Sequence, residues 1–230
     1  MNVDMEPGSA IDPSNTRLLL RLALGLTVTL VGVAAFAFLA GQIGAQTELG
    51  RADQALTDAL RVRVPHLVMQ VFSVLTHLAD TVTLTLLCIG IAGVLVNRGQ
   101  RWLALGWVIA VAGNGLLNQF LKQLFGRIRP LDPDGLALAT GFSFPSGHSS
   151  GAVVTYGMLA YLAIRLLSAR WHTLILLSAL IVVITVGSSR LILRVHFASD
   201  VMAGFASGSA WLALCITSIE FLRWWRLNHP

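Results

Sequence analysis

The stretch 189–200 carries several chemically active side chains between two long apolar runs, and it reads Ser-Arg-Leu-Ile-Leu-Arg-Val-His-Phe-Ala-Ser-Asp. His196 and Asp200 are four residues apart, so on a helix they share a face and can form a hydrogen bond. A carboxylate bonded to one imidazole nitrogen fixes the tautomer and leaves the other nitrogen free as a nucleophile or base. Arg190 adds a planar guanidinium that suits phosphate oxygens. Taken alone, the stretch is equally compatible with an ion pair and a capping histidine at a membrane edge.

Two further clusters make a chemical role the better interpretation. Residues 122–130 read Lys-Gln-Leu-Phe-Gly-Arg-Ile-Arg-Pro, and residues 145–148 read Pro-Ser-Gly-His. In order and spacing, the three clusters resemble the signature of the type 2 phosphatidic acid phosphatase superfamily. That signature is Lys, six residues, Arg-Pro; then Pro-Ser-Gly-His; then Ser-Arg, five residues, His, three residues, Asp. Every motif position is filled here, over about a third of the chain.

The resemblance implies a mechanism for the histidines. His196 would attack phosphorus and form a phosphohistidine, with Asp200 orienting the ring, and His148 would protonate the departing alkoxide before water releases phosphate. No metal or other cofactor is expected, because basic side chains would take the role that Mg²⁺ plays in many phosphoryl-transfer enzymes. A zinc site at His148 and His196 is disfavoured, because local spacing offers no third protein ligand.

A phosphate group carries about two negative charges near neutral pH, so binding it requires cations and N–H donors. The expected phosphate-binding residues are Lys122, Arg129, Ser146, Gly147 and Arg190. The Pro-Ser-Gly-His cluster opens an apolar run, so its N–H groups are expected at a helix N-terminus, where anions bind well. Glycine in this cluster lets the phosphate approach the backbone closely.

The composition places these residues in a membrane protein. The chain has 230 residues, of which 55% are hydrophobic and 12% charged, and its mean hydropathy is +0.74. A soluble domain carries roughly twice that share of charged residues. The net charge of +5 does not indicate nucleic-acid binding, because most arginines flank apolar runs and do not form one patch.

The apolar runs predict an all-α fold, a bundle of six transmembrane helices in one domain over 17–230, after a polar N-terminal tail over 1–16. The expected spans are 18–40, 79–96, 102–121, 149–166, 173–187 and 201–222. Pro130 is expected to end the third span and to turn Arg129 inward. Asn114, Asn118 and Lys122 fall on one face of that span, which must point into the bundle.

The segment between the first two spans is more polar. Leucine and alanine recur at helical spacing over 49–60 with charged residues between them, which predicts an amphipathic helix at the membrane interface. Pro65 should break this helix before a second short one. His77 and Asp80, near the start of the second span, are interpreted as interfacial capping groups.

The distribution of arginines orients the chain. Four short turns or termini without acids carry Arg17 and Arg21, Arg98 and Arg101, Arg165 and Arg170, and Arg223 and Arg226. The opposite side has the same number of basic residues, but five of them belong to the motif clusters: Lys122, Arg127, Arg129, Arg190 and Arg194. The positive-inside rule then predicts cytoplasmic termini and a site on the external, periplasmic face of a bacterial inner membrane.

These features predict a membrane phosphatase acting on lipid phosphate or diphosphate, such as phosphatidic acid, phosphatidylglycerol phosphate or undecaprenyl diphosphate. The expected partners are the lipid substrate and the bilayer, with no nucleic acid and no obligate protein partner. One alternative is phosphotransfer from a lipid diphosphate to another lipid. A non-catalytic transporter or scaffold is the other, but it has no need of His148, His196 and Asp200 together.

Overall fold

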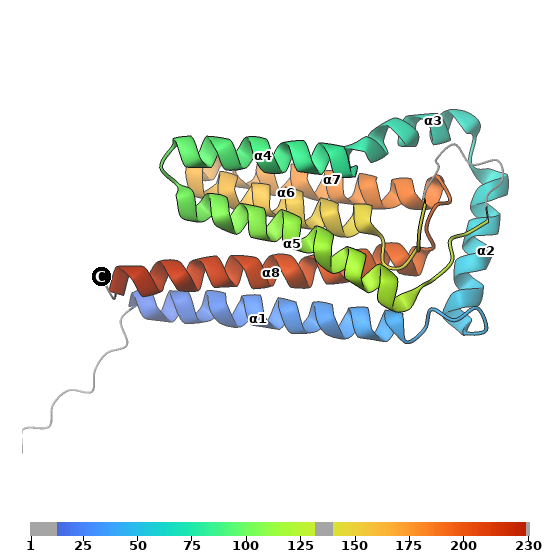
Figure 1. Cartoon of the computed structure of the whole chain (residues 1–230), viewed down its shortest axis with the longest axis horizontal. Helices are drawn as coiled ribbons and strands as arrows, with labels where there is room; N and C mark the ends of the chain where they lie inside the picture. The colour runs from blue at the N-terminus through green and yellow to red at the C-terminus, as the bar shows by residue number, and fades with distance from the viewer. Residues whose placement is uncertain (1–12, 132–139, 229–230) are drawn as a thin grey trace, which may run out of the picture.

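The computed structural model describes residues 13–131 and 140–228, and within these ranges the chain forms helices and loops without strands (Figure 1). The predicted all-α class is therefore confirmed. The α-helices are α1 (Pro13–Ala40), α2 (Glu48–Arg63), α3 (His66–Leu75), α4 (Thr81–Asn97), α5 (Arg101–Phe125), α6 (Gly147–Leu166), α7 (His172–Ile192) and α8 (Ala198–Asn228). Two short 3₁₀ helices are η1 (Thr76–Ala79) and η2 (Ala169–Trp171). The predicted tail lies mostly outside the described residues, and its residues 13–16 belong to α1.

Local sequence sets several helix ends. The side chain of Thr47 caps α2 by accepting a hydrogen bond from the Gly50 N–H, and the Val64–Pro65 pair separates α2 from α3, as predicted. Helix α5 ends at Phe125, because Gly126 takes a left-handed conformation at φ 57°. The prediction that Pro130 ends this helix was wrong, since glycine stops it four residues earlier.

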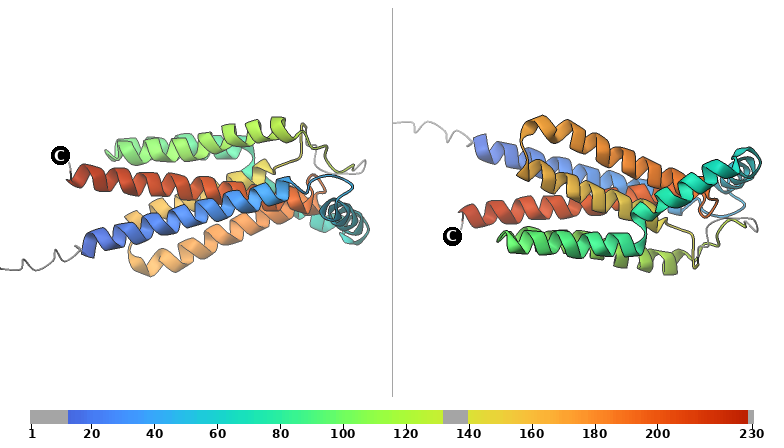
Figure 2. Two further views of the ribbon diagram at one scale, coloured as in Figure 1. Left: turned by 90° about the horizontal axis from the view of Figure 1, so that it is seen from below. Right: turned by 90° about the horizontal axis from the view of Figure 1, so that it is seen from above.

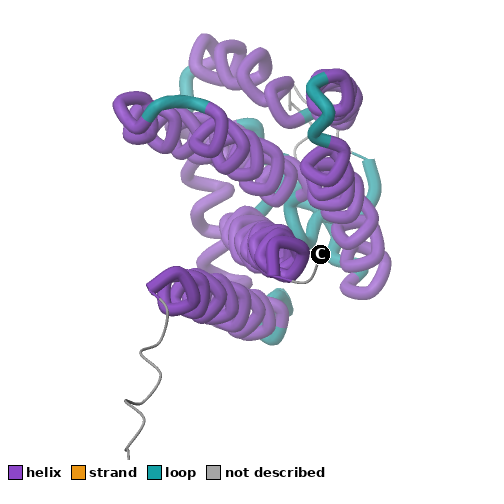
Figure 3. Tube along the Cα trace, turned by 90° about the vertical axis from the view of Figure 1, so that its left-hand side faces the viewer, coloured by secondary structure: helices purple, strands orange, loops and turns teal. Residues whose placement is uncertain are grey.

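Helix α8 is the central element of the bundle. It packs against α1 on one side and against α5, α6 and α7 on the other, as the end-on view and the two side views show (Figures 2 and 3). Helix α1 packs mainly on α8, and its outer face carries Leu20, Leu24 and Phe38, each at least 66% exposed. Such a face is compatible with lipid and unfavourable in water.

Within the described ranges 13–131 and 140–228, five helical segments are long and apolar enough to cross a membrane, so the protein is an integral membrane protein. They are Leu18–Ala40, His66–Asn97, Arg101–Phe125, Ala169–Ile192 and Ala198–Arg226. Helix α6, which covers the remaining predicted span, is not among them. It packs against α5, α7 and α8 and buries polar residues such as Ser149, Ser150 and Thr155, so it has less need of an apolar surface.

Helix α2 lies across one end of the bundle, opposite the end that holds the C-terminus (Figure 1). Its buried residues are Gly50, Asp53 and Thr57, whereas Leu56 from the predicted apolar stripe is 40% exposed. A helix forms here, as predicted, and it turns a polar face toward the bundle. Asp53 is therefore a buried group and not a solvated one.

Helices α6 and α8 approach each other closely through glycine. A Cβ added to Gly204 would lie 2.6 Å from the carbonyl oxygen of Ser146 and 2.8 Å from Cβ of Ser149. A Cβ at Gly208 would lie 3.0 Å from the Ser150 backbone. Two glycines four residues apart let helix backbones pack closely within a membrane. This contact holds the first turn of α6 against α8.

We expect Gly204→Ala to destabilise the protein, because the added methyl group meets the backbone of the α6 N-terminus. Overpacking of this kind costs about 1–3 kcal/mol. Gly93→Ala on α4 is the matched control, since nothing lies within 4 Å of its added Cβ, and the better helix propensity of alanine should keep or raise its stability. Thermal unfolding in detergent measures both. Equal melting temperatures for the two variants would contradict the close contact.

Candidate active site

The three sequence clusters meet at the end of the bundle that α2 crosses. Asp200, in the first turn of α8, links them. Its carboxylate accepts hydrogen bonds from Ser143 Oγ at 2.8 Å and from Arg127 at 2.7 Å, and it faces His196. Its backbone carbonyl accepts a bond from the N–H of Ser146 at 3.0 Å. One residue thus joins the loop after α5, the start of α6 and the turn before α8.

His196 lies in the turn between α7 and α8 and is 2% exposed. Its Nδ1 is 3.4 Å from Oδ2 of Asp200, and its Nε2 is 3.0 Å from a guanidinium nitrogen of Arg129. Arginine can only donate, so Nε2 accepts this bond and the ring proton belongs on Nδ1, toward Asp200. The ring therefore has the tautomer in which Nε2 carries the lone pair.

The surroundings of His196 favour the neutral ring. Burial lowers the pKa of His196 to about 3, and the charges of Arg129 and Arg190 act in the same direction, against the opposing effect of Asp200. The imidazole is consequently unprotonated near neutral pH. A neutral imidazole with an accessible Nε2 lone pair is the form required of a nucleophile.

Arg129 is held by backbone carbonyl groups. It donates to the carbonyl oxygens of Val195 at 2.7 Å, Gly141 at 3.0 Å and Thr140 at 3.2 Å. These neutral acceptors fix the orientation of the guanidinium but do not cancel its charge. The charge remains available to an anion beside Nε2 of His196.

The other two predicted cations also bond to neutral groups. Lys122 Nζ donates to the carbonyl oxygen of Phe142 at 2.5 Å, and Arg190 donates to Thr76 Oγ1 at 2.6 Å. Arg190 is 4% exposed, and its Nε has no hydrogen-bond partner among the described residues. A buried donor without an acceptor is unfavourable, and an oxygen of a bound anion would satisfy it.

The Pro-Ser-Gly-His cluster starts α6, as predicted. Ser146 is the N-cap: it is buried, and its Oγ accepts from the N–H of Ser149 at 3.4 Å and the hydroxyl of Ser149 at 2.9 Å. The hydroxyl oxygen of Ser146 is thus engaged in the helix cap. Gly147 packs so close to α5 that an added Cβ would lie 2.9 Å from Asn118 Oδ1 and 3.9 Å from Lys122 Cε.

His148 has a partner that the sequence interpretation missed. Its Nε2 is 2.8 Å from Oδ1 of Asp80, whose other oxygen contacts the exposed His77. Asp80 precedes α4, but its side chain makes no capping hydrogen bond. The interpretation of Asp80 and His77 as capping groups was therefore wrong, because both side chains belong to a chain of contacts that leads to His148. A carboxylate followed by a helix start is an ordinary pattern, and no local signal pointed to His148.

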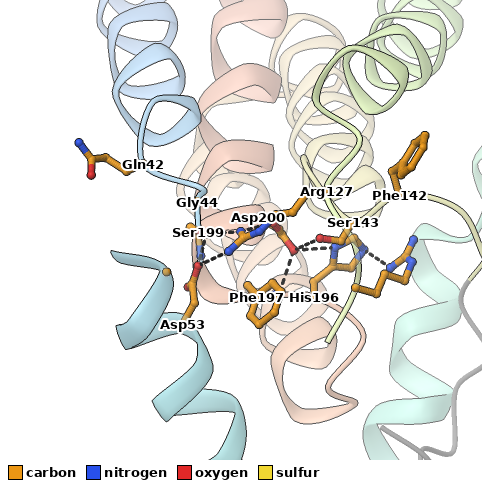
Figure 4. Close-up of polar contacts among 12 residues, drawn as sticks. Gln42, Gly44, Asp53, Arg127, Phe142, Ser143, His196, Phe197, Ser199 and Asp200 are labelled. Atoms are coloured by element: carbon orange, nitrogen blue, oxygen red, sulfur yellow. Dashed lines mark hydrogen bonds and ion pairs between the residues drawn. The ribbon is translucent and has the colours of Figure 1, made fainter. Parts of the chain in front are cut away.

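Arg127 and Asp53 form a second unexpected contact. Arg127, grouped by sequence with the phosphate-binding cations, instead lies between the carboxylates of Asp200 and Asp53, at 2.7 Å and 2.9 Å (Figure 4). Asp53 also accepts hydrogen bonds from the N–H of Ser199 at 3.0 Å and from its hydroxyl. Nothing in the local sequence of α2 distinguishes Asp53 from the other charged residues of that helix.

The arrangement combines the neutral His196 with a second histidine, His148, that bonds to the carboxylate of Asp80. It also holds three cations that make no ion pair with a carboxylate in the described part of the chain. Lys122, Arg129 and Arg190 are the expected anion-binding group, and Asn114 and Asn118 support it by donating to Ser150 Oγ. In the same described ranges, no three histidine, cysteine, aspartate or glutamate side chains are grouped to hold a metal ion.

Known proteins are similar to this chain in sequence and in fold. The profile described as the PAP2 superfamily matches residues 101–224. Phosphatidylglycerophosphatase B of Bacillus subtilis (strain 168) is 35% identical over 161 residues, which cover 68% of this chain and 78% of that protein. Lipid A 1-phosphatase of Rhizobium johnstonii is 34% identical over 131 residues, and this chain spans about half of its length (49%). The crystal structure of a transmembrane PAP2 type phosphatidylglycerolphosphate phosphatase from Bacillus subtilis superimposes with a TM-score of 0.74 at 30% identity, covering 81% of this chain and 94% of that one.

We expect the ring of His196 to stay neutral between pH 5 and 8, because burial lowers its pKa to about 3. Nuclear magnetic resonance of protein labelled at histidine measures this, and His196→Ala assigns the signal. The ¹⁵N shifts should show a proton on Nδ1 across this range. A midpoint near 6.5, the ordinary value for histidine, would contradict the proposed state of the site.

Proposed function

Because this chain belongs to the PAP2 superfamily and is a membrane phosphatase of that type, we propose that it removes the terminal phosphate of phosphatidylglycerol phosphate through a phosphohistidine on His196. The observation that carries the proposal is the state of His196, whose Nε2 faces Arg129 while its Nδ1 faces Asp200. A structural ion pair would not require an electron pair to be directed at a cation.

In the first step, the phosphate would bind between Lys122, Arg129 and Arg190, with one oxygen accepting from Nε of Arg190. Nε2 of His196 then forms a bond to phosphorus as the bond to the lipid oxygen breaks. The departing alkoxide takes a proton from His148, and the Nδ1 proton of His196 remains shared with Asp200. The three cations stabilise the charge on the equatorial oxygens.

In the second step, water attacks the phosphorus of the phosphohistidine. The N–P bond breaks and the electron pair returns to Nε2 of His196. The neutral form of His148 accepts a proton from the water, so the acid of the first step is the base of the second. Asp80, which bonds to His148, would hold its ring in place for both transfers.

The substrate class follows from the membrane setting and from the relatives. A site at one end of a transmembrane bundle suits a phosphate at the depth of lipid headgroups. Phosphatidylglycerol phosphate is our first candidate because the Bacillus subtilis relative matches over most of both chains. Phosphatidic acid and undecaprenyl diphosphate carry the same terminal phosphate chemistry and are the competing substrates.

We further propose how the chain lies in the bilayer. Helix α6 would be a sixth span, shielded from lipid by α5, α7 and α8. Helix α2 would lie at the interface, with Leu56 and Val62 directed at lipid, since they are 40% and 86% exposed. The site would face the periplasm of a bacterial inner membrane, because the arginine-rich turns lie at the other end of the bundle.

A substrate panel tests the function. Purified protein should release phosphate fastest from phosphatidylglycerol phosphate, and His196→Ala should reduce release from every lipid to background because the nucleophile is lost. Acid-labile phosphate on the wild-type protein, trapped by rapid quench, would identify the phosphohistidine. A preparation that transfers phosphate to an added lipid but not to water would favour phosphotransferase activity instead.

We expect His148→Ala to discriminate between leaving groups. General acid catalysis contributes ~10²–10⁴-fold when the leaving group is poor, as a lipid alkoxide is, whereas nitrophenolate leaves without a proton. The variant should therefore lose most lipid hydrolysis but keep much of its activity on p-nitrophenyl phosphate. The ratio of the two rates, compared with that of wild type, is the measurement. An equal loss on both substrates would indicate a role in binding or structure.

The proposed topology predicts a labelling pattern. With Cys88 and Cys215 replaced by alanine, a cysteine at Gln54, an exposed polar residue of α2, should react with an impermeant thiol reagent on intact cells. A cysteine at Gly99, in the turn between α4 and α5, should react only after permeabilisation. Labelling of Gly99→Cys alone in intact cells would reverse the orientation.

A further inference from the structure

A buried group on α2 is connected to the nucleophile through two residues. Asp53 is 2% exposed, and its carboxylate receives Arg127 at 2.9 Å and the N–H and hydroxyl of Ser199. These contacts occupy both of its oxygens. Helix α2 otherwise makes few contacts with the bundle, chiefly with α7 and α8. Its one buried charge is thus directed at the active-site end of α8.

Arg127 is shared between two carboxylates. The same guanidinium donates to Asp53 Oδ2 at 2.9 Å and to Asp200 Oδ1 at 2.7 Å, and one of its nitrogens also donates to Ser199 Oγ at 2.7 Å. Its position is fixed from another side by the ring of Phe197, whose centroid is 4.3 Å away. The Arg127 side chain is 9% exposed, and the two carboxylates are 2% and 0% exposed.

The charges of this cluster do not cancel. Two carboxylates and one guanidinium leave a net charge of −1, in a place where solvent screens little. If Arg127 paired with Asp200 alone, the pair would be neutral and would attract the Nδ1 proton of His196 weakly. Because the guanidinium of Arg127 also pairs with Asp53, Asp200 keeps negative charge for His196.

We propose that Asp53 is a positioning residue for His196, acting through Arg127 and Asp200. It sets the negative charge that strengthens the hydrogen bond from Nδ1–H of His196 to Asp200, and it stabilises the positive charge that develops on the ring when Nε2 bonds to phosphorus. The role in turnover rests on the proposed phosphatase function. The role in strengthening the hydrogen bond between His196 and Asp200 does not, because it concerns the unliganded protein.

A rival role for Asp53 is to anchor α2, and the two roles predict different results. Asp53→Asn keeps the size of the side chain and one acceptor oxygen, but it removes the charge and replaces the other oxygen with an NH₂ donor. Anchoring is weakened by the loss of one acceptor while the charge balance is lost in full, so the double variant with Arg127→Gln is needed to separate the two roles. Asp58→Asn is the matched control, because Asp58 lies on the same helix with 54% of its side chain exposed.

The experiment compares variants that change the net charge of the cluster formed by Asp53, Arg127 and Asp200. Asp53→Asn should lower kcat on the preferred lipid by about 10–100-fold, the range seen when a group that orients a site residue is removed, with KM changed less than threefold. Asp53→Asn combined with Arg127→Gln restores the net charge of −1, so this double variant should be faster than Asp53→Asn alone. If Asp53 acts only as an anchor, the second substitution would lower the activity further. That result would overturn the proposal.

A second readout needs no turnover. In ¹H–¹⁵N spectra of histidine-labelled protein, the Nδ1 proton of His196 should have the same chemical shift in wild type and in Asp58→Asn. Asp53→Asn should move this proton upfield, because its hydrogen bond to Asp200 becomes weaker. An unchanged chemical shift in Asp53→Asn would reject the inference. If wild type releases no phosphate from any lipid, the proposed function fails, and the proton-shift measurement still decides the role of Asp53.

Discussion

The site depends on the Asp200 carboxylate and on the ability of the bundle to bury it. A carboxylate with no exposed surface is stable only if donors surround it, and here the donors come from different parts of the chain: Ser143, Arg127 and the N–H of Phe197. These partners fix where the loop after α5 and the turn before α8 lie. Satisfying one buried charge therefore also places the side chains that would carry out the chemistry.

Close helix packing provides the burial. Helix α6 is surrounded by other helices and approaches α8 through Gly204 and Gly208. The first turn of α6 is then pressed against α8, and the Ser146 N–H reaches the Asp200 carbonyl. Helix α1 adds an outer layer on α8, and its Phe36 packs with Phe125 and Phe144 beside the site. The glycines at the contact between α6 and α8 and the apolar side chains of α1 thus both help to bury the Asp200 carboxylate.

The sequence predicted the residues that carry regular spacing or a motif. Hydrophobic runs located the long helices, and the spacing of His196 and Asp200 indicated their contact. Residues contributed by distant segments without a motif were missed, as Asp53 and Asp80 were, because only the tertiary fold brings them to Arg127 and His148. Pro130 was predicted to end α5, but Gly126 ends it. Both residue types interrupt helices, and their positions in the sequence do not show which of the two does so here.

The bond between Arg129 and Nε2 of His196 has a consequence for the resting protein. A lone pair that accepts a hydrogen bond is not free to attack at the same time. An arriving phosphate would compete for the same guanidinium, and the lone pair would be released as the anion takes the N–H. Reactivity would then switch on only when an anion occupies the site, and electrophiles without negative charge would find the histidine masked.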